Sequence, residues 1–168
     1  MNNPAVPFTL EQGVTDFMSL LEPATELYSR LILVVGRAQT RKSTVLKTVA
    51  AATGGTLINV GLTLTTALLA YEPRQLPFKT DELLSALVRK APHVPVLLDN
   101  IDILFDRKLA VDPMVLLQKV SRSQTLIVAW RGVIERGTLH YAKPDHREWR
   151  TYPVRDLLVV DLNRGQDQ

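Results

Sequence analysis

Residues 31–46 read LILVVGRAQTRKSTVL, and the rest of the chain is organised around this stretch. Its first five residues are apolar, as in a central strand of a parallel sheet that is covered on both faces. Gly36 ends the run, a polar segment follows, and from Thr44 onward apolar residues return at helical spacing. The stretch therefore predicts a strand, a loop and a helix in succession.

The loop in this stretch resembles the phosphate-binding pattern G-x-x-x-x-G-K-[ST], or Walker A motif, and reads G-R-A-Q-T-R-K-S. Backbone N–H groups of such a loop and of the following helix start form an anion site, and the lysine reaches the terminal phosphates. Arg41 stands where the second glycine would be, and it lacks glycine's conformational freedom. A chance match at a strand–helix junction is the alternative. We expect nucleotide binding by Gly36, Arg37, Ala38, Gln39, Thr40, Arg41, Lys42, Ser43 and Thr44.

A second apolar run, residues 96–98, ends in Asp99 like a Walker B strand. We expect Asp99 to lie near Ser43 across the adjacent strand, so that the two side chains hold Mg²⁺; the alternative is an aspartate that caps a turn. Asn100 follows where many P-loop ATPases carry a glutamate, and an amide can orient a water but cannot accept its proton. Asp102 could act through a water instead. Arg131, after the apolar run 126–130, is a candidate γ-phosphate sensor, so the candidate catalytic residues are Asn100, Asp102 and Arg131.

Expected strands alternate with helices along the chain, at residues 31–35, 56–60, 96–99, 125–130 and 157–161. This order predicts a three-layer α/β fold of the P-loop NTPase type, AAA-like or RecA-like, with a five-stranded mainly parallel sheet and no C-terminal helical lid. A length of 168 residues fits one domain, residues 1–168. We expect residues 1–28 to be a helical lead-in broken at Pro23, Thr80 to cap a helix over 81–90, and residues 132–153 to be an irregular basic excursion or a hairpin. We also expect Gly54 and Gly55 to end the helix that follows the loop, and Asp112 to cap a helix with Pro113 in its first turn that runs to about Arg122.

The composition is that of a globular chain, with 46% hydrophobic and 22% charged residues and a net charge of +3. The absence of cysteine excludes disulfides and thiolate metal sites, and neither a signal peptide nor an apolar run of the ~20 residues needed to span a membrane is evident. We therefore expect a cytoplasmic protein. Three arginines of the basic excursion, Arg136, Arg147 and Arg150, are candidates to reach a neighbouring subunit's nucleotide. The basic excursion as a whole is either a solvated, loop-rich face or a surface that binds phosphate or a partner.

Four segments together, GRAQTRKS, VLLDNIDILFD, LIVAWRG and HYAKPDHREWRTY, resemble the BrxF family, the small P-loop component of type III BREX bacteriophage-defence systems. The resemblance covers nearly the whole chain, from about Leu10 to Leu162. It implies membership of a bacterial, cytoplasmic defence complex that also contains a DNA methyltransferase and a large ATPase. It also implies that Gly36, Lys42, Ser43 and Asp99 form the nucleotide site.

Taken together, the sequence predicts an ATP- and Mg²⁺-binding module, a weak or partner-activated ATPase that acts as a switch or assembly factor. We expect it to form a homo-oligomer in a nucleotide-dependent way and to assemble with other phage-defence proteins. Arg41 and Asn100 leave hydrolysis itself undecided. They favour an alternative, a catalytically degenerate scaffold or DNA-contacting adaptor. A small-molecule P-loop kinase is a third interpretation, against which stands the lack of an acidic residue before Glu72 in the segment after the second strand.

Overall fold

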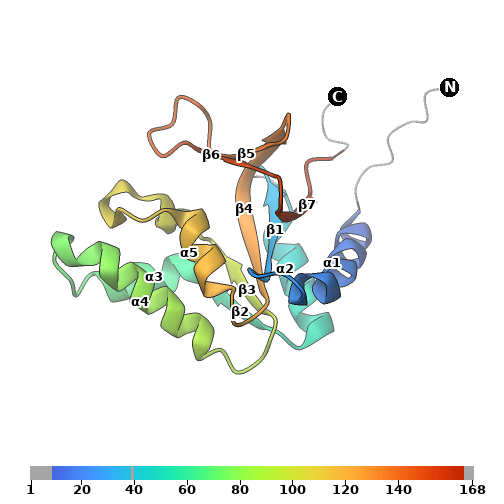
Figure 1. Ribbon diagram of the computed structural model, residues 1–168, viewed down its shortest axis with the longest axis horizontal. Helices are drawn as coiled ribbons and strands as arrows, with labels where there is room; N and C mark the ends of the chain where they lie inside the picture. The colour runs from blue at the N-terminus through green and yellow to red at the C-terminus, as the bar shows by residue number, and fades with distance from the viewer. Residues whose placement is uncertain (1–8, 39, 165–168) are drawn as a thin grey trace.

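A computed structural model describes residues 9–38 and 40–164 and shows an α/β fold built on a mainly parallel sheet (Figure 1). Five parallel strands lie in the order β2-β3-β4-β1-β7, and β5 and β6 extend the sheet from β4. The strands are β1 (Leu31–Gly36), β2 (Thr56–Asn59), β3 (Val96–Asp99), β4 (Leu126–Glu135), β5 (Thr138–Tyr141), β6 (Arg150–Pro153) and β7 (Leu158–Asp161). The predicted α/β class with a mainly parallel sheet is confirmed.

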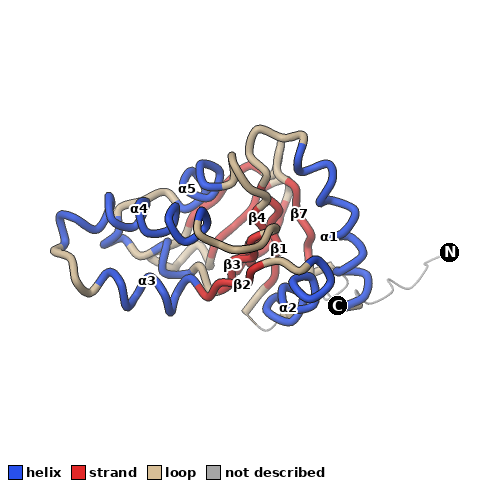
Figure 2. The backbone as a smooth tube through the Cα atoms, turned by 90° about the horizontal axis from the view of Figure 1, so that it is seen from below, coloured by secondary structure: helices blue, strands red, loops and turns tan. Residues whose placement is uncertain are grey.

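Helices cover both faces of the parallel sheet (Figure 2). Residues of α1 (Leu10–Thr25) and α2 (Lys42–Thr53) share one hydrophobic cluster with Ile32 and Val34 of β1. Residues of α3 (Val60–Leu68), α4 (Leu76–Arg89) and α5 (Pro113–Val120) share the other with Leu33 and Val35. Because alternate side chains of a strand point to opposite faces, a continuous apolar run such as residues 31–35 is what a strand between two helical layers requires.

The predicted excursion after β4 is an antiparallel extension of the sheet rather than irregular chain. β4 continues to Glu135, turns through residues 136–137 and pairs with β5, which in turn pairs with β6. Four aromatic rings at its base, those of Phe105, Trp130, Tyr141 and Tyr152, contact one another, and the Trp130 Nε1–H donates to the carbonyl oxygen of His140 at 3.1 Å. The hairpin alternative is therefore the correct one, and the extension rises beyond the carboxyl edge of the parallel strands (Figure 1).

Two helix boundaries differ from the sequence predictions. The first helix, α1, is not broken at Pro23, which lies in its last turn next to the fully buried Ala24, and the helix ends two residues later at Thr25. Thr80 does not cap a helix. It lies inside α4, which already begins at Leu76, and its buried hydroxyl donates to the carbonyl oxygen of Leu76 at 2.7 Å.

Other boundaries agree with the predictions. Asp112 caps α5, Pro113 occupies its first turn, and Gly54 ends α2 in the left-handed conformation with φ of 71°. Residues 1–8 of the expected lead-in lie outside the described part of the chain. Within the described part, no helix is long and apolar enough to cross a membrane.

Candidate functional site

The loop between β1 and α2 is a tight turn that requires glycine at its start. A Cβ on Gly36 would lie 2.1 Å from the Thr40 hydroxyl oxygen. That hydroxyl donates to the carbonyl oxygen of Arg37 at 2.8 Å, and the Thr40 N–H donates to the same oxygen at 3.1 Å. Ala38 is exposed on the loop, and Gln39 lies outside the described residues. The predicted strand, loop and helix are thus present in the predicted order.

Lys42 begins α2 and turns its side chain back over the loop. Its ammonium donates to the carbonyl oxygen of Arg37 and to the Thr40 hydroxyl, the second at 3.0 Å. Burial lowers the pKa of Lys42 and nearby Arg131 acts in the same direction, whereas the carboxylates of Asp102 and Asp99 oppose the shift. The ammonium therefore lies at the meeting point of the loop and the candidate acidic residues, a partly buried cation held by neutral oxygens.

Arg41 adopts a backbone conformation that does not need glycine. Its φ is −84° and its ψ is 37°, and the side chain is exposed and makes no capping hydrogen bond. Replacing glycine by arginine at this position therefore does not strain the backbone. Ser43 and Thr44 follow in the first turn of α2 with exposed side chains, where free backbone N–H groups accumulate. An anion would find both the helix terminus and the Lys42 ammonium here.

The carboxyl ends of β1, β3 and β4 bring the acidic and basic candidates to the same edge of the sheet. Asp99 ends β3, and the expected adjacency of β1 and β3 is wrong, because β4 lies between them. Asp99 is nevertheless close enough to the start of α2 to influence the pKa of Lys42. Arg131 pairs in register with Gly36 and so occupies the intervening position. The pairing of strands that are distant in sequence is decided by the whole sheet, and the local pattern contains no sign of it.

Asn100, directly after β3, contacts both Asn59 at the end of β2 and the start of α3. It has φ of 55°, and its side-chain amide donates to the Asn59 side-chain oxygen at 3.2 Å. The same Asn59 oxygen accepts the N–H of Leu62 and caps α3. A Cβ on Gly61 would lie 2.4 Å from the Asn100 amide nitrogen, so α3 starts in close contact with this loop. Asn100 thus links the ends of β2 and β3.

Asp102 and Arg131, both candidate catalytic residues, form an ion pair at 3.2 Å. The two side chains are 36% and 51% exposed, so water screens the pair and it contributes little to stability. Asp102 also adjoins Tyr141, whose pKa is raised first by burial and then by this carboxylate. The pair connects the segment after β3 with β4, and both of its members influence the pKa of Lys42.

A magnesium ion would depend on few protein ligands. The described residues contain no cluster of three or more histidine, aspartate and glutamate side chains that could hold a metal by themselves. Mg²⁺ commonly binds through one or two protein oxygens together with substrate phosphates and waters. The Asp99 carboxylate, whose Oδ1 accepts the Asn100 N–H at 2.9 Å, and the exposed Ser43 hydroxyl are donors of that kind. The donor set fits Mg²⁺ brought in with a phosphate.

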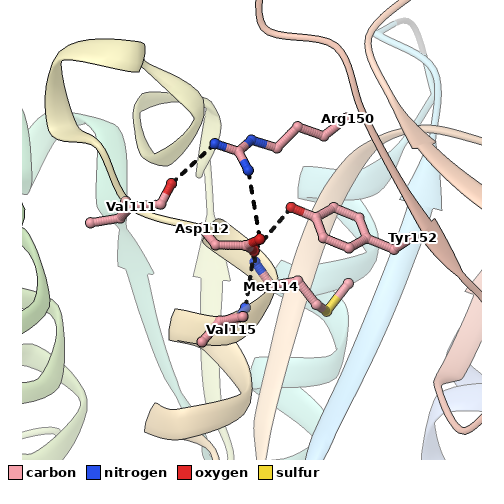
Figure 3. A network of polar contacts seen from close by, with 6 residues as sticks. All are labelled: Val111, Asp112, Met114, Val115, Arg150 and Tyr152. Atoms are coloured by element: carbon pink, nitrogen blue, oxygen red, sulfur yellow. Dashed lines mark hydrogen bonds and ion pairs between the residues drawn. The ribbon is translucent and has the colours of Figure 1, made fainter.

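The three candidate trans arginines differ in their surroundings. Arg136 lies exposed in the β4–β5 turn and Arg147 lies exposed in the loop between β5 and β6. Arg150 instead donates to the Val111 carbonyl oxygen at 3.3 Å and pairs with Asp112 at 3.6 Å (Figure 3). To reach a neighbouring subunit, Arg150 would have to leave these contacts.

One buried residue at this edge has no counterpart in the sequence predictions. Asn163, 7% exposed, follows β7, and its Oδ1 accepts the N–H of Arg37 at 3.0 Å. Its Nδ2 donates to the carbonyl oxygen of Gly132 at 3.0 Å. This amide therefore ties the start of the loop to β4. A single asparagine in a polar terminal segment carries no motif, and only the strand order reveals its place.

Comparison with known proteins identifies no relative. No protein-family model matches the chain, and no curated protein or solved structure matches it either. The class that fold and site define is thus an α/β domain with a candidate anion-binding loop at the carboxyl edge of a parallel sheet.

Proposed function

We propose that this chain binds a nucleoside triphosphate, ATP in the first instance, together with Mg²⁺ at the β1–α2 loop. The observation that supports the proposal is the convergence of Lys42, Asp99, Asp102 and Arg131 on one helix N-terminus at the carboxyl edge of a parallel sheet. Ligands of such sheets bind at this edge. We further propose that the sheet is of the AAA-like or RecA-like P-loop type, with the Walker A and Walker B strands separated by the strand that carries Arg131.

Each residue would have a distinct role in this site. The N–H groups at the start of α2 would bind inner phosphates, and Lys42 would exchange its contacts with Arg37 and Thr40 for the terminal phosphates. Mg²⁺ would neutralise the phosphate charge, with Ser43 and Asp99 as protein ligands. Arg131 would leave its weak pair with Asp102 for the terminal phosphate, which frees the Asp102 carboxylate to orient a water. Self-association, a trans role for Arg136 and Arg147, and assembly with bacterial phage-defence proteins are further parts of the proposal.

A scaffold or DNA-contacting adaptor is the second candidate function, and one observation favours it. Asn100 stands where a general base is expected, and its amide is engaged by Asn59. An amide cannot take the proton of an attacking water. A chain that binds nucleotide without turning it over would serve as a switch of assembly rather than as a catalyst.

Isothermal titration of ATP with Mg²⁺ tests the proposal. We expect saturable binding that falls roughly 10- to 100-fold in Lys42→Ala, the loss of a charge-assisted contact. Lys47→Ala is the matched control, since Lys47 is exposed on the same helix, and it should bind as the unaltered chain does. No binding at millimolar ATP, or equal binding by both variants, would refute a nucleotide site at this loop. Phosphate release measured on the same samples separates the ATPase from the scaffold.

A further inference from the structure

A pocket of about 790 Å³ lies beside the loop, between it and the antiparallel extension of the sheet. We call it the hairpin pocket. It is lined by loop residues Arg37, Ala38 and Thr40, by residues of β4 between Arg131 and Glu135, and by residues between His140 and His146. Its size falls within the roughly 300–1,000 Å³ of small-molecule sites. Its loop residues and Arg131 also belong to the proposed nucleotide site, whereas its lining residues from Gly132 to His146 have no role there.

The hairpin pocket combines an apolar wall with a cationic side. Val133, Ala142 and Pro144 supply apolar surface, and His140 adds an imidazole that stacks on Trp149 with ring centroids 6.2 Å apart. Such a wall suits the flat face of a ring. The carboxylates of Glu135 and Asp145 also line the pocket, and they would accept hydrogen bonds from amino or hydroxyl groups.

The cationic side consists of Arg37, Arg131 and Lys143. Guanidinium groups bind phosphate oxygens in a bidentate manner. Arg131 is half exposed and only weakly paired with Asp102, so a phosphate can replace that carboxylate as the partner of the guanidinium group. An apolar wall opposite such groups fits a ligand that carries both a ring and a phosphate.

The position of the hairpin pocket relates it to the terminal phosphate of the proposed nucleotide. The N-terminus of α2 would hold the inner phosphates, and Lys42 reaches toward the terminal one. The Lys42 ammonium lies on Arg37 and Thr40, which also line the hairpin pocket. The pocket therefore opens at the terminal-phosphate end of the loop, where a second molecule could lie beside a bound triphosphate.

We propose that the hairpin pocket binds a second ligand, a ring-bearing phosphate monoester of the nucleoside monophosphate class, next to a triphosphate on the loop. The ring lies against the apolar wall, and the phosphate lies between Arg37, Arg131 and Lys143. This proposal rests on the proposed function for its placement beside the terminal phosphate. A phosphate acceptor also meets the objection to a kinase, because its nucleophilic oxygen is already an anion and needs no carboxylate base.

Two sequential titrations test the hairpin pocket. The chain is first saturated with Mg²⁺ and a non-hydrolysable ATP analogue, and then titrated with AMP or CMP by calorimetry. We expect a second saturable event, at least tenfold weaker in Val133→Trp, which fills the pocket, and in Lys143→Glu, which reverses a charge. Val115→Trp and Lys108→Glu, on exposed residues outside the pocket, are the matched controls. Trp149 fluorescence offers an independent readout, and thermal melting checks that each variant folds.

The outcomes separate this proposal from the nucleotide site. Analogue binding followed by no AMP or CMP binding would overturn the hairpin pocket and leave the loop site intact. The hairpin pocket is equally refuted if Val133→Trp and Lys143→Glu bind the monophosphates as the controls do. If the analogue does not bind but AMP binds the free chain and depends on Val133 and Lys143, the pocket stands and the proposed function fails. Adenosine and inorganic phosphate, titrated separately, should each bind more weakly than AMP.

Discussion

Replacing Asn163 with leucine should both destabilise the chain and weaken ATP binding. Leucine has a similar volume but can neither accept the Arg37 N–H nor donate to the Gly132 carbonyl oxygen, contacts that are both 3.0 Å long in the structure. Each lost bond that leaves a shielded backbone group without a partner costs about 1–3 kcal/mol. Since water can reach the Arg37 side of the site, we expect a total loss of about 2–4 kcal/mol in the free energy of unfolding.

Asn163→Asp separates the contribution of the hydrogen bond from Arg37 from that of the hydrogen bond to Gly132. The carboxylate still accepts the Arg37 N–H but cannot donate to Gly132, so it should perturb the β4 side more than the loop. Urea denaturation measures the free energy of unfolding, and titration with ATP and Mg²⁺ measures the loop. Arg164→Ala is the control, because Arg164 is the exposed neighbour. If Asn163→Leu stays within about 0.5 kcal/mol of Arg164→Ala in stability and binds ATP equally well, Asn163 does not hold the loop.

Four further predictions concern pKa, capping and the loop. Phosphate binding should raise the lowered pKa of Lys42 back toward the ordinary lysine value of 10.5, so the protein should take up protons when it binds ATP at alkaline pH below that value. Calorimetry in buffers of different ionisation enthalpy measures this uptake, and Lys42→Ala should lack it. Burial and then Asp112 raise the pKa of Tyr152 from 10.0 to about 12, so the unfolded chain loses this proton first and stability falls between those pH values. Tyr152→Phe should remove about 1 kcal/mol of that fall, allowing for a partly exposed ring. If the free energy of unfolding, measured by urea denaturation, falls with pH equally in Tyr152→Phe and in the unaltered chain, the assignment is wrong. Asp112→Ala removes the α5 cap and should cost about 1–2 kcal/mol by the same melts, whereas a neutral result would mean that the Met114 and Val115 N–H groups find other partners. Gly36→Ala should abolish ATP binding, because its Cβ would overlap the Thr40 hydroxyl, and unchanged affinity would show that the loop can rearrange.

Local patterns in the sequence were sufficient for the elements near the loop. The apolar run 31–35 predicted a buried strand, and β1 is buried throughout. Asp112 followed by Pro113 predicted the start of α5, and Gly54 predicted the end of α2. These signals are local because a cap, a first-turn proline or a left-handed glycine acts within a few residues. The local signal failed at Pro23, past which α1 continues to Thr25, and at Thr80, which is fully buried inside α4.

The composition of the site edge was decided by tertiary structure. The sequence named Lys42, Asp99, Asp102 and Arg131 separately, but the order β2-β3-β4-β1-β7 places Arg131 between the other strands and pairs it with Asp102. The same order brings Asn163 into hydrogen-bonding contact with Arg37 of the loop, and it places residues of β4, β5 and the segment after β5 around the hairpin pocket. Hydrogen bonding between strands joins residues that are distant in sequence, and the periodicity of a single strand does not contain its partner. The sequence therefore determined which chemistry the chain carries, and the sheet determined which of those groups meet.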